Sequence, residues 1–528
     1  MTPTSRVNNN GKTKNGTNKM LFNSYIFILF FLPLSLWGYF FFSKKEEGKK
    51  NTGSILWLAL CSLWFYCYAT PLHLAVILPS IFINYGSSLL IRKRVRENKS
   101  TAGLFSIALV LQLGILFFFK YTNFFLDLTW EYHHLEERLS LVLPLGISFF
   151  TFSQISFLID SKRGEMEEPS FMEYLVYVTW FPKLTMGPIM TFSEFSPLLR
   201  DEEKRKPDVR NISEGLYTFA LGLAKKVLIA DTLGKIVAIG FLDVYVINSM
   251  TALITMVSYT LQIYFDFSGY CDMAVGIGRM FNLTVPENFN SPYKALSITD
   301  FWKRWHMTLT SFFTRYLYIP LGGNRKGKIV TYRNIFLVFL VSGLWHGANM
   351  TFVLWGAIHG FFMVMERAGK DLVHRFKKKK IAAKEVSVIV KATASAVTLI
   401  RWCITFTIIN VTWVLFRSES VERFSVFMEQ LTSGGWQPDP RITELFLDLI
   451  EIRLLKRAGL QFLLDQYPVI CLWILLAALA GFCVLFKNRR EKTPIKSFNW
   501  VNSITVMILL LWCIFSLSDI TTFLYFEF

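Results

Sequence analysis

Long apolar blocks separated by short charged stretches run through almost the whole chain. They lie at 22–43, 53–69, 71–91, 103–128, 139–159, 171–198, 212–242, 250–281, 331–347, 350–366, 395–416, 468–486 and 499–516. Most approach or exceed the roughly 20 residues that a helix needs to cross a bilayer. The pattern predicts an all-α, polytopic integral membrane protein with about 10–13 membrane helices.

One apolar block is interrupted in a way that a straight membrane helix tolerates poorly. Block 171–198 contains Pro182, Gly187-Pro188 and Pro197, and charged segments flank it on both sides. Proline breaks the helical hydrogen-bond ladder, and broken backbone at membrane depth must be buried within protein. We therefore expect a re-entrant segment here.

The same pattern predicts the domain organisation. Residues 1–20 are polar and should form a disordered tail, and residues 21–528 should form a single membrane domain. Within that domain, the charged and mixed stretch 417–467 is expected to be a non-spanning helical insert.

Composition and charge support a membrane protein. Hydrophobic residues make up 53% of the chain and charged residues 18%, which departs from the composition of soluble domains. The net charge of +18 is divided among short clusters between apolar blocks. This distribution is typical of topology signals, so we predict no nucleic-acid partner. The seven cysteines fall in apolar stretches without metal-ligand spacing, and we expect no metal site.

The basic connections indicate an orientation. Segments 44–50 and 92–99 are basic and are predicted to face the cytoplasm, whereas 130–138 is acidic and is predicted to lie outside.

Block 250–281 carries polar groups inside an apolar helix. Gln262, Asp266 and Tyr270 follow each other at four-residue spacing and share one face, while Asp272 points elsewhere. A carboxylate costs about 2.5–3.5 kcal/mol on insertion scales unless it finds a partner or a wet cavity. These groups either bind neighbouring helices and fix their packing or contact substrate.

The stretch 301–360 places two histidines among aromatic and aliphatic residues. We expect an amphipathic helix, capped at residue 299 or 300, with Trp302, Trp305 and His306 on one face.

The second histidine, His346, lies near the end of block 331–347, which block 350–366 follows almost directly. The two blocks should form a hairpin with His346 at its tip. Small residues such as Gly343 leave room around the imidazole, and Trp355 supplies a wall. Imidazole titrates near neutral pH and can take a proton from a hydroxyl, so His346 is either a general base or a hydrogen-bonded structural residue.

These motifs resemble one known family. The runs FWKRWH at 301–306, SGLWHGANMTFVLWGAIHG at 342–360, PLGISFFTF at 144–152 and FPKLTMGPI at 181–189 are similar to the membrane-bound O-acyltransferase (MBOAT) family, specifically its bacterial alginate O-acetyltransferase-like branch. The resemblance implies a ring of membrane helices with a passage between a cytoplasmic donor pocket and an extracytoplasmic acceptor site. It also implies a multi-pass protein of the inner or plasma membrane.

The resemblance further implies the chemistry. His346 corresponds to the family's probable base and His306 to its second histidine. The acyl donor would be acetyl-CoA used as a substrate, with no bound cofactor, and the acceptor a cell-surface polysaccharide such as an alginate-like exopolysaccharide. An exported acetyltransferase partner protein is also expected. We expect the substrates to contact Trp302, Lys303, Arg304, Trp305, Asp266, Asn324, Trp345 and Asn349.

Two alternatives remain open. The D-alanyl transfer protein of teichoic acid modification is similar in the same motifs and takes its acyl group from a carrier-protein thioester. A membrane transporter would also explain buried carboxylates and histidines, although it predicts repeated halves that the sequence does not show.

Overall fold

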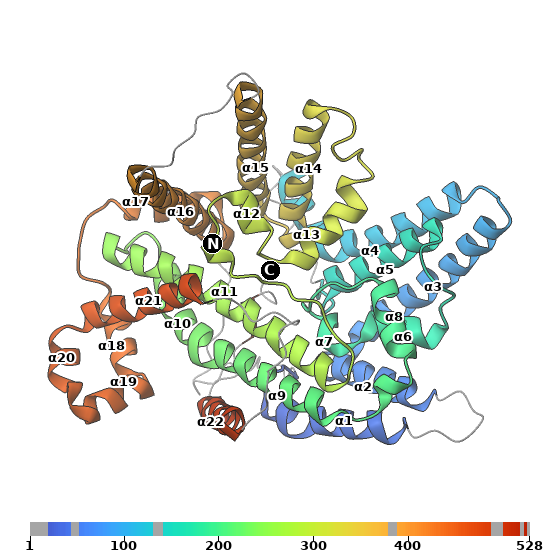
Figure 1. Cartoon of the computed structure of the whole chain (residues 1–528), viewed down its shortest axis with the longest axis horizontal. Coiled ribbons are helices and arrows are strands. Elements are labelled where there is room, and N and C mark those ends of the chain that lie inside the picture. Colours follow the sequence, from blue (N-terminus) through green and yellow to red (C-terminus); the bar gives the residue numbers. More distant parts are fainter. Residues whose placement is uncertain are drawn as a thin grey trace.

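The computed structural model describes residues 20–43, 52–129, 141–377, 388–486, 500–517 and 522–524. Within these ranges every regular element is a helix, which confirms the expected all-α fold (Figure 1). The expected tail at 1–20 lies, apart from residue 20, outside the described residues, as do the segments 44–50 and 130–138.

The helices follow one another with short connections. The first part of the chain forms α1 (Leu32–Phe41), α2 (Gly53–Ala69), α3 (Leu74–Arg96), α4 (Ala102–Thr129), α5 (Ile147–Arg163), α6 (Phe171–Thr179), α7 (Phe181–Leu184), α8 (Phe192–Arg200), α9 (Val209–Ala224), α10 (Asp231–Leu242) and α11 (Ser249–Met280). The second part forms α12 (Ile298–Trp302), α13 (Met307–Phe313), α14 (Lys328–His346), α15 (Met350–Lys377), α16 (Val388–Arg417), α17 (Val421–Gln430), α18 (Pro440–Asp448), α19 (Ile450–Leu455), α20 (Gln461–Gln466), α21 (Pro468–Leu485) and α22 (Trp500–Ser516).

Several of these helices are suited to a bilayer. By length and composition, five could cross a membrane: Pro71–Arg96, Ala102–Leu126, Lys328–His346, Ser395–Arg417 and Pro468–Leu485. Three shorter apolar helices are Phe27–Phe41, Gly53–Tyr68 and Trp500–Ser516. The chain is therefore a multi-pass membrane protein. The number of crossings stays a prediction, because these eight helices are distinguished by length and composition only.

Close packing of α9 against α11 forms the centre of the molecule, where the two helices run beside each other (Figure 1). Glycines permit this approach. A Cβ atom on Gly269 would stand 2.8 Å from the carbonyl oxygen of Gly222, and one on Gly276 would stand 2.6 Å from that of Gly215. Small residues at facing positions allow helix backbones to approach closely where the hydrophobic effect cannot drive association.

The predicted break in block 171–198 is present. The block divides into α6, α7 and α8, with Pro182 in the first turn of α7 and Pro197 inside α8. All four residues of α7 are buried, so the interrupted backbone is enclosed by protein, as broken structure at membrane depth requires.

The carboxylates of α11 form ion pairs with two consecutive lysines. Asp266 accepts from Lys226 Nζ at 2.8 Å and from the backbone N–H of Leu524 at 3.1 Å. Asp272 accepts from Lys225 Nζ at 2.5 Å. These bonds favour the interpretation that the polar groups of α11 fix the packing of neighbouring segments.

Residues 417–467 contain the short helices α17 to α20, of which α18 to α20 lie with α21 at the lower left of Figure 1. The longest of them, α17, has ten residues, too few for a membrane crossing.

Candidate active site

The segment around His306 is broken, and the prediction of one amphipathic helix through this region was wrong. Helix α12 ends at Trp302 and α13 begins at Met307, directly after His306. The N-cap is Ser297, whose hydroxyl accepts from the backbone N–H of Asp300, and neither residue 299 nor residue 300 caps the helix. His306 has φ +46°, in the left-handed region that side-chain-bearing residues rarely adopt.

Asn288 explains why the chain breaks at this point. Its side-chain oxygen accepts from the backbone N–H of Thr308 at 3.1 Å and from the Thr308 hydroxyl at 2.8 Å, and it lies 3.2 Å from His306 Nδ1. Its backbone carbonyl accepts from the Met307 N–H at 3.0 Å. A strained residue persists only where its surroundings over-determine its conformation, and such residues cluster at functional sites. Asn288 therefore fixes both the backbone and the imidazole of His306.

His346 is the last residue of α14, and α15 begins at Met350, so the predicted hairpin with His346 at its tip is confirmed. The imidazole is buried and meets aromatic rings on several sides. Ring centroids of Trp345, Trp355 and Phe416 lie 4.9, 5.3 and 5.3 Å from that of His346. Aromatic side chains therefore enclose this imidazole.

Trp345 connects the two histidines. Its ring centroid lies 6.3 Å from that of His306 and 4.9 Å from that of His346, in edge-on arrangements. Phe152 stacks on the same indole at 5.1 Å. The two predicted catalytic residues, which come from different helix ends, therefore converge on one tryptophan.

Lys120 and Tyr121 of α4 were not predicted from the sequence, although they contact the end of the His346 helix. Lys120 Nζ donates to the carbonyl oxygens of Trp345 at 2.6 Å and His346 at 3.1 Å, and Tyr121 Oη donates to that of Leu344 at 2.7 Å. A signal was present in the sequence, because Lys120 is a basic residue inside the apolar block 103–128.

His359 has a partner in the same aromatic cluster. Trp302 Nε1 donates to His359 Nδ1 at 3.2 Å, and the His359 ring lies 4.8 Å from that of Trp355. His359 therefore has the environment of a hydrogen-bonded structural histidine, and the same hydrogen bond fixes the indole of Trp302.

Two other predicted contact residues lie next to His306 in the chain but have structural partners. Arg304 donates to Asp300 at 2.8 Å. Trp305 is buried in the aromatic core, with its ring 5.0 Å from that of Trp413.

The remaining predicted contact residues lie in a turn or are bound to other parts of the chain. Asn324 is exposed in the turn after α13. Asn349 accepts from the Thr351 N–H at the start of α15 and donates to the carbonyl of Glu419. Asp266 is occupied by Lys226, as described above.

A cavity of about 240 Å³ lies between α12, α13 and the α14–α15 hairpin, and its lining includes neither His306 nor His346. Ser342 contributes to its wall and precedes His346 by one helical turn, and the exposed Lys303 also lines it. Its other lining residues are Thr299, Trp302, Leu309, Thr310, Phe313, Thr314, Tyr318, Ile335, Val338, Phe339 and Met363. The cavity offers an apolar slot with a cation in its wall.

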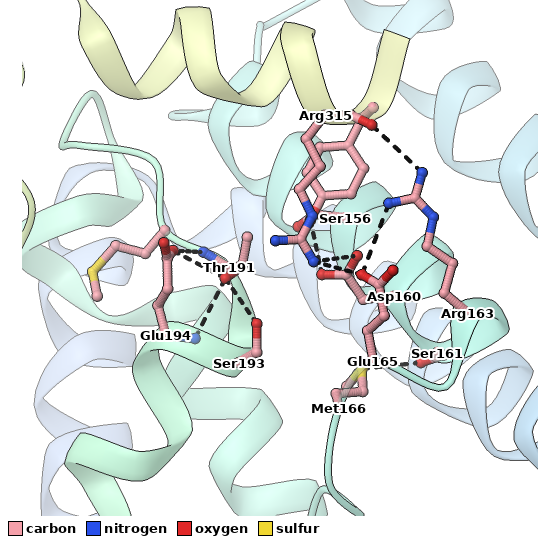
Figure 2. A network of polar contacts seen from close by, with 12 residues as sticks. Ser156, Asp160, Ser161, Arg163, Glu165, Met166, Thr191, Ser193, Glu194 and Arg315 are labelled. Carbon is pink, nitrogen blue, oxygen red and sulfur yellow. Dashed lines mark hydrogen bonds and ion pairs between the residues drawn. The ribbon is translucent and has the colours of Figure 1, made fainter. Parts of the chain in front are cut away.

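A polar network fixes the π-helical turn Thr314–Tyr318 that follows α13 (Figure 2). Arg315 contacts Asp160 at 3.3 Å and Glu165 at 2.7 Å, and Tyr316 Oη donates to Asp160 at 2.8 Å. Burial raises the pKa of the Asp160 carboxyl. Figure 2 also shows the capping box at Thr191, whose hydroxyl accepts from the Glu194 N–H. The network anchors one wall of the cavity to α5.

Comparison with known proteins identifies relatives with a stated chemistry. The model of MBOAT, the membrane-bound O-acyltransferase family, matches residues 55–416. The chain is 39% identical to the peptidoglycan O-acetyltransferase of Helicobacter pylori over 431 residues, covering 76% of this chain and 78% of that protein. It is 32% identical to the probable alginate O-acetylase AlgI of Pseudomonas putida, covering 96% and 100%. The teichoic acid D-alanyltransferase of Bacillus subtilis is 28% identical over 44% of this chain and 60% of its own.

Proposed function

Because the chain belongs to the membrane-bound O-acyltransferase family and is an acyltransferase, we propose that it moves an acetyl group from cytosolic acetyl-CoA to hydroxyls of an extracytoplasmic polysaccharide. The relatives that support acetyl as the group are an O-acetyltransferase and an O-acetylase, and both cover most of the chain. They act on peptidoglycan and alginate by name, so a polysaccharide is the acceptor class that they share. The location we propose is the inner or plasma membrane.

The observation that carries the proposal is the convergence of His346 and His306 on Trp345 from two helix ends. A buried imidazole enclosed by aromatic rings is suited to general-base chemistry, because water that would compete for the acyl group is excluded. His306 is held by Asn288 in a conformation that costs backbone strain, which is typical of a positioned functional group.

The reaction would proceed by direct attack. The acceptor hydroxyl gives its proton to an imidazole nitrogen of His346 while its oxygen bonds to the thioester carbonyl carbon. The tetrahedral intermediate collapses as the carbon–sulfur bond breaks, and the proton returns from His346 to the departing thiolate. His306 would orient the donor or stabilise the developing oxyanion. If an exported partner protein carries the acetyl group onward, its hydroxyl is the first acceptor.

The 240 Å³ cavity is the place that we propose for the thioester arm of the donor. Lys303 in its wall, with the exposed basic turn at residues 325–328, would bind the phosphates of coenzyme A.

The alternatives have less support. The D-alanyltransferase relatives match less than half of the chain at lower identity than the acetyltransferases. Membership of an acyltransferase family decides against the transporter.

The test is acetyl transfer by the purified protein with radiolabelled acetyl-CoA. His346→Gln should lower kcat by about 10²–10⁴-fold, the usual contribution of a general base. The matched control is His359→Gln, which removes a buried imidazole from the same aromatic cluster and should leave most of the activity. Transfer only from a D-alanyl carrier-protein thioester, or unchanged activity of His346→Gln, would contradict the proposal.

A further inference from the structure

The C-terminal end of α14 is held from outside by two consecutive residues of α4. Lys120 and Tyr121 together donate to three successive carbonyl oxygens, those of Leu344, Trp345 and His346, at 2.6 to 3.1 Å. More than 220 residues of sequence separate the donors from the acceptors. Contacts so distant in sequence require that α4 be placed correctly against the hairpin.

These carbonyls belong to a group that a helix cannot satisfy by itself. The last four carbonyl oxygens of an α-helix lack intrahelical donors, and in an apolar environment each unsatisfied group is costly. The chain leaves α14 in an extended conformation at Gly347, with φ −161° and ψ 153°. The carbonyl of His346 therefore lies where the backbone changes direction, and the donor that binds this carbonyl also fixes the position of the His346 side chain.

Lys120 is connected to a third element as well. Its Nζ lies 3.4 Å from the hydroxyl of Ser148 in the first turn of α5. An amino group with three donors can satisfy all three of these acceptors at once. Tyr121, with one hydroxyl, adds the fourth link in this arrangement.

From this geometry we propose that Lys120 is the positioning residue for His346, and that Tyr121 assists it. The inference rests on the proposed function, in which His346 is the base. Lys120 does not touch the reacting atoms in this account, since its amino group is bound to backbone carbonyls. Its role is to keep the imidazole at the end of α14 in the orientation in which it accepts the proton of the acceptor hydroxyl.

The experiment compares steady-state kinetics of purified variants at equal concentrations of folded protein. Lys120→Met should lower kcat on the order of 10²-fold, the loss expected when a catalytic group moves by 1 Å. KM for acetyl-CoA should change by less than about threefold, because the donor does not contact Lys120. Lys120→Arg keeps a charged donor and should recover part of kcat. Lys235→Met, at an exposed position on α10, is the matched control and should behave like wild type.

Further variants separate positioning from a merely structural role. Tyr121→Phe should lower kcat less than Lys120→Met does, without changing KM, and it serves as the test if Lys120→Met does not accumulate. A loss of total activity that disappears after correction for folded protein would overturn the inference, as would an unchanged kcat in Lys120→Met. If His346→Gln is inactive while Lys120→Met is fully active, only this inference fails. If His346→Gln is active, both the proposed function and the inference about Lys120 fail.

Discussion

Gly343 offers a way to displace His346 without altering any polar group. It lies on α14 three residues before His346 and faces Gly356 on α15. A Cβ atom on Gly343 would overlap the carbonyl oxygen of Phe352 and stand 3.1 Å from the Cα of Gly356. Both obstacles are backbone atoms, which cannot rotate away, so Gly343→Ala must separate the two arms of the hairpin.

The size of the effect follows from the contact. Carbon and carbonyl oxygen normally touch at about 3.3 Å, so relief of the overlap requires α14 to shift by about 1 Å. A displacement of that size at a catalytic group typically costs about 10²-fold in rate, which corresponds to roughly 2.7 kcal/mol of barrier. We therefore expect Gly343→Ala to lower kcat by about two orders of magnitude, although every hydrogen-bonding group is retained.

The assay is the rate of acetyl transfer by the purified variant, with folded protein measured by its elution as a single species. Gly114→Ala is the matched control, since Gly114 lies in α4 and its added Cβ would have nothing within 4 Å. That variant should have wild-type activity. A Gly343→Ala protein as active as Gly114→Ala would refute the claim that His346 depends on close packing of the hairpin.

Three further predictions concern the surroundings of the site. Asn288→Ala removes the acceptor beside His306, so it should cost about 1–3 kcal/mol of local stability and lower kcat. Asn288→Asp keeps an acceptor and should lower kcat less in the same kinetic assay. Trp302→Phe replaces the indole by a smaller phenyl ring and removes the donor to His359, so the melting temperature of the variant should fall relative to wild type. Burial raises the pKa of Asp160, so the folded wild type should lose stability relative to Asp160→Asn as pH rises from about 4 through that raised pKa. A difference in melting temperature between the two proteins that does not change with pH would contradict this.

The sequence was sufficient for features that depend on local pattern. Apolar blocks predicted the helical membrane fold, prolines predicted the break between α6 and α8, and the short Ala348-Asn349 connection predicted the hairpin tip at His346. Each of these follows from the composition of one continuous segment.

Features that depend on distant partners could not be predicted in this way. The periodicity of Trp302, Trp305 and His306 is that of a helix, yet the helix breaks at His306, where Asn288 accepts hydrogen bonds from the backbone N–H groups of Met307 and Thr308. Helical periodicity records which residues are apolar, and it contains no information about a competing side-chain acceptor such as Asn288, 18 residues before His306.

The carboxylates of α11 show the same limit. The sequence left open whether Asp266 binds substrate or a neighbouring helix, since both uses demand a buried partner. The structure pairs it with Lys226, 40 residues earlier in the chain. For Lys120 the sequence shows a basic residue inside an apolar block, but it does not identify the acceptors of that residue, because these are backbone carbonyls that no sequence motif marks.

The most direct measurement of the central claim uses proteoliposomes with radiolabelled acetyl-CoA sealed inside and polysaccharide acceptor, with any exported partner protein, added outside. The wild-type protein should transfer label to the external polymer as base-labile acetyl ester, and His346→Gln should transfer none above the protein-free background. Labelling of the external polymer by His346→Gln at the wild-type rate, or no labelling by the wild type, would contradict acyl transfer across the membrane with His346 as the base.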